Sequence, residues 1–425
     1  MTIQVEQAIY IVSAGALLSY LLYAKRKMDV FLIGGVSAIL FSLPLAVGTL
    51  PGSAGLPDRV VQPTLYISFV FLILAIFVAA LCWDSSGRAT TKNSREVARR
   101  SFAERRLMSG LLALIWFFVF SILLYKNGSG LLFGESKREI VDSATWMHSA
   151  FISITSLVSV WWFFFSGLRG KAFAVGILLV SLIIGHRSSI ALAGVSLMLL
   201  YGKSWPEISL VRRFPLFAPV GLVAAIFSVA LLKPLYASFK AGGIASIGDL
   251  FTSYGLIQLA QKGSEFLGTQ YIFNEIVLKN FTTTGGHIFR GPLSVLPIPR
   301  TLYTTPSSEF NDLFQSALFP GRASGMAYNS IGEFYAGAGL LGVFFFVVVM
   351  GVSLITLAAL MQRSRWNLTP VIAVVAALVA FYSYRNSVAV TAGFIRNIVW
   401  PYLMIWLLAK SFSGAGRSQK VDKYG

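Results

Sequence analysis

The chain has 425 residues, of which 56% are hydrophobic and 12% are charged, and its mean hydropathy is +0.72. Soluble domains are about half apolar and about a quarter charged, and the apolar residues here come in blocks close to the ~20 residues that cross a bilayer. These values exclude an ordinary soluble protein and indicate an all-α, polytopic membrane protein.

The apolar blocks predict eleven transmembrane helices, with the N-terminus outside and the C-terminus in the cytoplasm. The N-terminus lacks the basic region of a signal peptide, so we expect the first block to remain as a helix. Eight helices fall in residues 1–233, a long extracytoplasmic loop in 234–332, and three helices with a cytoplasmic tail in 333–425. The blocks lie at about 7–24, 29–48, 63–83, 108–125, 146–167, 172–185, 188–201, 214–233, 333–360, 368–384 and 388–409.

The net charge of +18 follows the same pattern. Basic segments occur at every second connection between apolar blocks, as the positive-inside rule requires of cytoplasmic loops. The charge therefore indicates topology and contact with membrane lipids and argues against a nucleic-acid partner. The segment 88–106, the most basic, could also dock a partner protein. A single cysteine, Cys82, rules out a disulfide framework.

Two of the blocks are unusually short and flank His186 and Arg187. Fourteen residues of helix span roughly 21 Å, less than the ~30 Å hydrocarbon core. We expect two short helices that meet at His186–Arg187 and place this pair below the outer surface. A buried arginine there needs a counter-ion or water.

The long loop at 234–332 contains enough apolar residues to be ordered. Residues 247–278 have the spacing of an amphipathic helix, and residues 289–310 are interrupted by prolines. Long structured loops of this kind are usually lids or binding elements.

Several arginines lie outside the basic cytoplasmic loops. The guanidinium group can bind two phosphate oxygens at once, so arginines that converge on one cavity would suit a diphosphate or another polyanion. The alternative for each is a structural ion pair or a side chain that reaches the membrane surface. These residues are Arg187, Arg290, Arg300, Arg322, Arg385 and Arg396.

Glu333 and His186 are the candidate catalytic residues. A carboxylate or imidazole at the membrane surface could act as a general base, although Glu333 could equally cap a helix and a lone histidine is often structural. His287 and Asn329 complete the candidate substrate-binding set. The chain has no phosphate-binding P-loop sequence and no Cys/His cluster with metal spacing, so we expect neither a cofactor nor a metal site.

Three short sequences, in this order, resemble a known family. "LPIPRTLYTTPSSEF" (296–310) looks like the Pro-Arg loop of bacterial oligosaccharide repeat-unit polymerases, the Wzy-type O-antigen polymerases. "NSIGEFYAGAGLLGV" (329–343) is similar to their Gly-Glu-aromatic stretch, and "YRNS" (384–387) to their late Arg-Gly-Ser. The chain departs from the family at Thr305–Pro306, where Lys-Pro is common, and at Asn386, which replaces glycine.

This resemblance implies a metal-independent glycosyltransferase with a GT-C-like fold. It would transfer a glycan from one undecaprenyl diphosphate to a second lipid-linked repeat unit, on the periplasmic face of the bacterial inner membrane. Arg300, Arg322 and Arg385, with Arg187, would hold the diphosphate, and a chain-length regulator is a candidate partner. An O-antigen ligase, a lipid-linked oligosaccharide flippase or other transporter, and a membrane scaffold remain alternatives.

Overall fold

The computed structural model is almost entirely helical, and its only described strands form one two-stranded hairpin. It describes residues 4–25, 28–52, 57–85, 102–128, 131, 145–202, 238, 248, 265–298, 310–320, 328–364 and 367–421. The elements are α1 (Val5–Ser19) with the π-helical η1 (Tyr20–Lys25), α2 (Val30–Ser42), η2 (Leu43–Val47), β1 (Thr49–Leu50), β2 (Arg59–Val60), α3 (Pro63–Ser85), α5 (Phe102–Asn127), α8 (Thr145–Phe165), α9 (Leu168–Ile183), α10 (Arg187–Gly202), α14 (Glu265–Leu278), α15 (Gly286–Leu293), α16 (Phe310–Leu318), α17 (Ser330–Arg363), α18 (Thr369–Ala380), η5 (Tyr382–Tyr384) and α19 (Val388–Val421).

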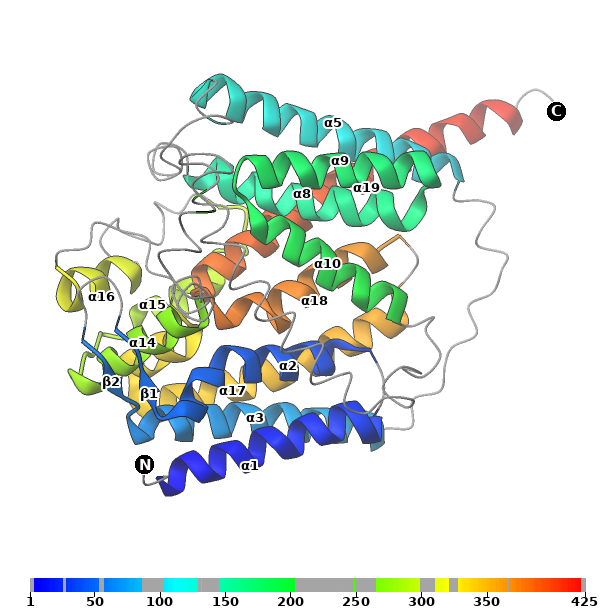
Figure 1. Ribbon diagram of the computed structural model, residues 1–425. Coiled ribbons are helices and arrows are strands. Elements are labelled where there is room, and N and C mark those ends of the chain that lie inside the picture. Colours follow the sequence, from blue (N-terminus) through cyan, green and yellow to red (C-terminus); the bar gives the residue numbers. More distant parts are fainter. Residues whose placement is uncertain are drawn as a thin grey trace.

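Seven of the described helices are long and apolar enough to cross a membrane. A multi-pass, helical membrane protein is therefore confirmed in outline. The expected blocks coincide with described helices except for 214–233, which lies outside the described residues, so the count of eleven stays a prediction. The two termini lie at opposite ends of the helices (Figure 1), as an odd number of spans requires.

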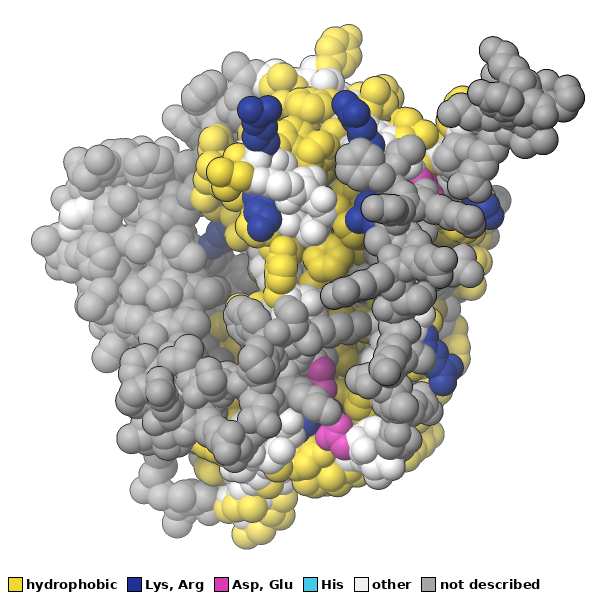
Figure 2. All heavy atoms as spheres, turned by 90° about the vertical axis from the view of Figure 1, so that its right-hand side faces the viewer, with side chains coloured by type: hydrophobic (Ala, Val, Ile, Leu, Met, Phe, Trp, Pro, Cys, Tyr) yellow, Lys and Arg dark blue, Asp and Glu magenta, His cyan; other side chains and the backbone are white. Residues whose placement is uncertain are grey.

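The end of the bundle that carries the C-terminus is basic. Figure 2 looks onto this end and shows Lys and Arg side chains standing among apolar ones. The described basic residues at these helix ends are Lys25, Arg105, Arg106, Arg169, Lys171 and Arg363. These residues belong to the basic segments from which a cytoplasmic face was predicted, and the orientation itself stays a prediction.

Local sequence explains where several helices begin. Asp29 precedes α2, and its Oδ1 accepts hydrogen bonds from the N–H groups of Phe31 and Leu32, at 3.0 Å each. Pro63 opens α3, where the missing N–H costs nothing because the first N–H groups of a helix lack partners within it. These caps satisfy groups that would be costly to leave unpaired in a membrane.

The helices form two groups joined by α18. One group contains α1, α2, α3 and α17, and the other contains α5, α8, α9 and α19 (Figure 1). α18 packs against α2 and α17 on one side and against α8, α10 and α19 on the other. Eight of its twelve residues are Ala or Val, so neighbouring helices can approach closely.

The turn at His186 confirms the prediction of two short helices. α9 ends at Ile183 and α10 begins at Arg187, with Gly185 between them at a φ of 93°, a conformation that favours glycine. His186 is 3% exposed and Arg187 is partly buried, and the depth of this pair in the membrane stays a prediction.

α14 differs from its predicted character. Residues 265–278 are helical, but every residue from Thr269 to Ile276 is buried, which an amphipathic surface helix would not show. Its polar residues bond to the end of α2 and to the connection between α2 and α3. The remainder of the predicted helix, 249–264, lies outside the described residues.

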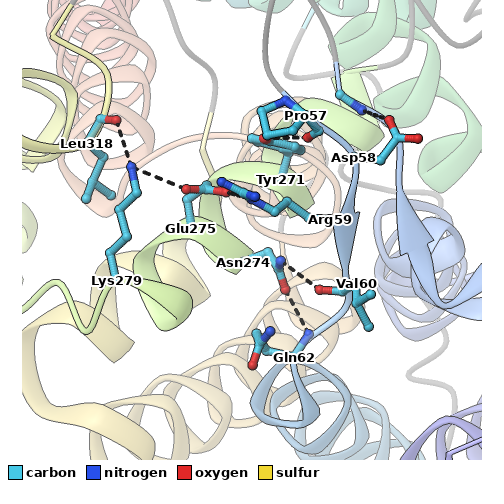
Figure 3. A network of polar contacts seen from close by, with 11 residues as sticks. Pro57, Asp58, Arg59, Val60, Gln62, Tyr271, Asn274, Glu275, Lys279 and Leu318 are labelled. Atoms are coloured by element: carbon cyan, nitrogen blue, oxygen red, sulfur yellow. Dashed lines mark hydrogen bonds and ion pairs between the residues drawn. The ribbon is translucent and has the colours of Figure 1, made fainter.

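Side chains of α14 make these contacts with the hairpin connection between α2 and α3 (Figure 3). The amide of Asn274 accepts from the N–H of Gln62 at 2.8 Å and donates to the carbonyl of Val60 at 3.1 Å, and the Tyr271 hydroxyl donates to Pro57. Glu275 pairs with Arg59 and with Lys279. Part of the long loop is thereby fixed to the N-terminal helices.

α17 is interrupted near its outer end. Ala338 and Gly339 have non-helical backbone angles, and Gly339 lies at φ 61° and ψ −148°. The first part, from Ser330, is therefore a short helix of its own, followed by the long apolar helix. Gly337 approaches Gly285 closely, because a Cβ at Gly337 would lie 3.2 Å from the Cα of Gly285.

Candidate functional site

The beginning of α17 lies against the turn that precedes α19. Asn329 caps α17 by accepting a hydrogen bond from the N–H of Gly332 at 2.7 Å. The next residue, Ser330, has its hydroxyl within hydrogen-bond distance of the carbonyls of Ser383, at 3.1 Å, and Asn386, at 2.7 Å. Two of the three sequences that carry the family resemblance are thus brought together.

Glu333 connects the same two elements through its carboxylate. It is 1% exposed, and its Oε2 accepts a hydrogen bond from the N–H of Val388, the first residue of α19, at 3.0 Å. Ser387 accepts from the N–H of Val390 at 3.0 Å. Glu333 therefore lies in the first turn of α17 and also caps α19, and the dipoles of both helices favour a negative charge there.

Arg385 lies in the turn before α19 and is half-buried. Its guanidinium group lies over the ring of Tyr382, 5.6 Å from the ring centre, which is a cation–π geometry. We call Asn329, Ser330, Glu333, Arg385 and Val388 the Glu333 junction. It holds one carboxylate, one guanidinium group and the N-termini of two helices.

Three buried hydrogen-bonding atoms without a partner belong to residues in or next to the two segments that form this junction. Within the part of the chain that the structure describes, Nδ2 of Asn329, Oη of Tyr384 and Oγ1 of Thr391 are buried and make no hydrogen bond. Buried polar atoms are nearly always paired, so three unpaired ones close to the same turn indicate a place where a polar ligand or water binds.

His287 contacts the junction from α15. Its Nε2 lies 3.3 Å from the carbonyl oxygen of Glu333, and its Nδ1 lies 3.3 Å from the hydroxyl of Thr283. Burial lowers the pKa of His287, and the positive charge of Arg290 lowers it further. The hydrogen bond to the Glu333 carbonyl raises it, but by less than burial lowers it. The neutral ring can donate from Nε2 and accept from Thr283, so His287 positions the backbone of Glu333.

The second predicted catalytic residue, His186, lies in a different cluster. Its Nε2 is 2.8 Å from Nδ1 of His148, and both rings are 3% exposed. His148 was not singled out from the sequence, because it opens an apolar helix without any motif. The signal that was available is that two of only three histidines in the chain flank the outer ends of neighbouring spans.

A polar residue of α19 contacts Ser149, the residue that follows His148. Asn397 donates to the hydroxyl of Ser149, next to His148, at 3.2 Å, and accepts from Nε of Arg396 at 3.4 Å. Asn397 is nine residues beyond Val388, which is about 13 Å along a helix axis. Among the contacts of the described residues, His186 pairs with His148 and Glu333 with Val388, and α19 contacts both regions.

The remaining predicted residues are distributed as follows. Arg187 begins α10 beside His186 and is half-buried, as is Arg396, whereas Arg290 is exposed on α15. Arg300 and Arg322 lie outside the described residues. Among the residues that are described, no three His, Cys, Asp or Glu side chains are grouped closely enough to hold a metal ion.

Comparisons of the chain with known protein families, with curated proteins and with solved structures found no match.

Proposed function

We propose that this protein is a membrane glycosyltransferase that polymerises oligosaccharide repeat units carried on undecaprenyl diphosphate, and that the Glu333 junction is part of its active site. The observation that supports this most is the junction itself. It brings the Gly-Glu-aromatic sequence and the late arginine sequence of the resembled family into contact, around buried polar atoms that have no hydrogen-bond partner.

The proposed reaction needs two kinds of group. The bond between the anomeric carbon and the diphosphate oxygen breaks, a new bond forms to a hydroxyl oxygen of the acceptor sugar, and that hydroxyl loses its proton. Arginine side chains can stabilise the departing diphosphate without a metal ion, because its developing charge lies on oxygens that a guanidinium group binds. Arg385 is the described arginine suited to this role, with Arg300 and Arg322 as further candidates from the resemblance.

Glu333 is proposed as the group that accepts the proton or that fixes the acceptor. The N–H of Val388 and the dipole of α19 both favour its charged form, which is the form that a base requires. A shared reaction with His186 is not part of the proposal, since that residue belongs to the other cluster.

The test uses a strain that lacks the gene and carries the Glu333→Gln variant. Glutamine keeps an oxygen that can accept from Val388, so the cap and the protein level should remain while the charge is lost. We expect the ladder of polysaccharide chain lengths to shorten to a single repeat unit. Arg385→Lys should have a similar effect, because the ammonium group of lysine cannot bind two phosphate oxygens at once as the planar guanidinium group does.

Arg363→Lys, at the opposite end of α17, is the matched control and should leave the ladder unchanged. A normal ladder in the Glu333→Gln strain would reduce Glu333 to a helix cap and remove the junction from the site. Full-length polysaccharide that is not attached to lipid A–core would indicate a ligase. In proteoliposomes, movement of the lipid-linked unit without chain growth would indicate a transporter.

A further inference from the structure

The segment from Gly291 to Ile298 runs along α19 toward the middle of the bundle. At one end, Gly291 touches the first turn of α19, because a Cβ on Gly291 would lie 3.2 Å from the backbone nitrogen of Ala389. At the other end, the indole N–H of Trp400 donates to the carbonyl of Val295 at 2.9 Å. Ala389 and Trp400 are about 16 Å apart along the helix axis. The indole of Trp400 points back toward the start of α19 and spans roughly one turn of that distance.

The depth of Val295 follows from the length of α19. Val388–Phe412 is the apolar part of this helix and has 25 residues, or about 38 Å against a hydrocarbon core of ~30 Å. Trp400 is the middle residue of that stretch. A carbonyl that accepts from its indole therefore lies several ångströms inside the core if α19 spans the bilayer, although the sequence placed Val295 in an extracytoplasmic loop.

The exposed side chains of this segment are those that lipid would contact. Phe289 is 74% exposed, Leu293 40%, Leu296 42% and Ile298 37%. The segment follows α15, which packs against α19, and Met404 of α19 is 64% exposed. In water, so many exposed apolar side chains would be unfavourable, whereas in a bilayer they need no protein partner.

The backbone of the segment is suited to an environment without water. The N–H groups of Ser294, Val295 and Leu296 bond to the carbonyls of the third residue before each, at 3.0, 3.1 and 2.9 Å. Pro292 and Pro297 have no N–H to satisfy. Unpaired backbone groups are costly in hydrocarbon, and the donors of Ser294, Val295 and Leu296 are all paired here.

Arg290 lies at the shallow end of the segment. Its guanidinium carbon is 3.8 Å from the place that a Cβ on Gly286 would occupy, so the side chain folds back by one turn toward the start of α15 and away from Val295. An arginine near a membrane surface reaches toward water and lipid phosphates in this way.

From these observations we infer that residues 289–298 form a re-entrant segment embedded in the outer leaflet, with lipid chains against Phe289, Leu293, Leu296 and Ile298 and a lipid phosphate at Arg290. This inference does not depend on the proposed enzymatic activity.

The test measures the environment of spin labels in lipid nanodiscs that contain phosphatidylethanolamine and phosphatidylglycerol. The exposed natural cysteine is first removed as Cys82→Ser, and labels are then attached to Leu293→Cys or Leu296→Cys. Leu407→Cys, on the exposed side of α19, is the lipid control, and Ser316→Cys, exposed on α16, is the water control. Collision with oxygen reports lipid, and collision with a water-soluble nickel chelate reports water.

We expect the labels at 293 and 296 to behave like the label at 407, with frequent oxygen collisions and few nickel collisions. Nickel collisions as frequent as those at 316 would place the segment in water and overturn the inference. Few collisions with either reagent would mean that protein covers this face, which would overturn it as well. Two label positions are used so that one poorly folded variant does not decide the result.

Discussion

Arg59 and Glu275 are 216 residues apart in sequence, and their side chains form an ion pair in which Nε and Oε1 are 2.5 Å apart. Glu275 is almost completely buried, whereas about a third of the Arg59 side chain is exposed. The hydrogen bond to Glu275, followed by its negative charge, raises the pKa of Arg59. This contact fastens α14 to the hairpin beside the first helices.

Removing either partner should lower the melting temperature of the purified protein in detergent. Arg59→Ala leaves a buried carboxylate with only Lys279 as a charged partner, at 3.4 Å. Lys279→Ala should have a smaller effect, because Lys279 is 44% exposed. A double-mutant cycle of Arg59→Ala with Glu275→Gln should show coupling, and strictly additive effects would contradict a direct pair.

His287 should make the stability of the protein sensitive to mild acid. Its pKa in the folded state is below the ordinary 6.5, so below pH 6.5 the unfolded chain binds a proton that the folded protein disfavours. The contribution of His287 is therefore fully present above pH 6.5 and is lost as the pH falls toward the lowered pKa.

The variant His287→Gln should lose less stability than the wild type between pH 7 and pH 5, in thermal unfolding at each pH. His148 and His186 are present in both proteins, so their contributions cancel in the comparison. Parallel curves for the two proteins would argue against the lowered pKa.

A buried hydrogen bond joins α5 to α8. The indole N–H of Trp116 donates to the hydroxyl of Thr155 at 2.9 Å, and both side chains are buried. Thr155→Val preserves the shape but leaves the indole without an acceptor, which should reduce the free energy of unfolding by about 1–2 kcal/mol. Thr155→Ser keeps the hydroxyl and should cost clearly less. Equal losses in both variants would assign the effect to packing.

Gly339 should resist substitution although there is space beside it. A Cβ there would meet nothing within 4 Å, but its φ of 61° and ψ of −148° suit only glycine. Gly339→Ala should therefore destabilise the protein by about 1–3 kcal/mol. Gly15→Ala, in the regular part of α1 and equally uncrowded, should be neutral or stabilising by up to about 1 kcal/mol. If both substitutions have the same effect on thermal unfolding, the interruption of α17 is not fixed by Gly339.

The sequence by itself determined where the helices lie. Long apolar blocks must satisfy their backbone hydrogen bonds internally, so hydropathy locates them within a few residues, as α3 and α8 show. It also predicted the division at His186, because one continuous helix would have placed the basic segments 168–171 and 203–213 on opposite sides of the membrane. The hydropathy and the length of a block depend only on neighbouring residues, so both can be obtained from the sequence alone.

Only the tertiary structure decided which polar residues meet. Glu333 was expected either to cap its own helix or to act as a base, and its partner is the N–H of Val388, 55 residues away. No sequence pattern distinguished His148 or Arg59. His148 pairs with His186, a predicted site residue, and Arg59 pairs with the buried Glu275. The path of residues 291–298 along α19 likewise could not be read from the sequence, which placed them in the long loop. Such pairings depend on how helices far apart in sequence pack, and apolar periodicity along one helix does not specify its neighbours.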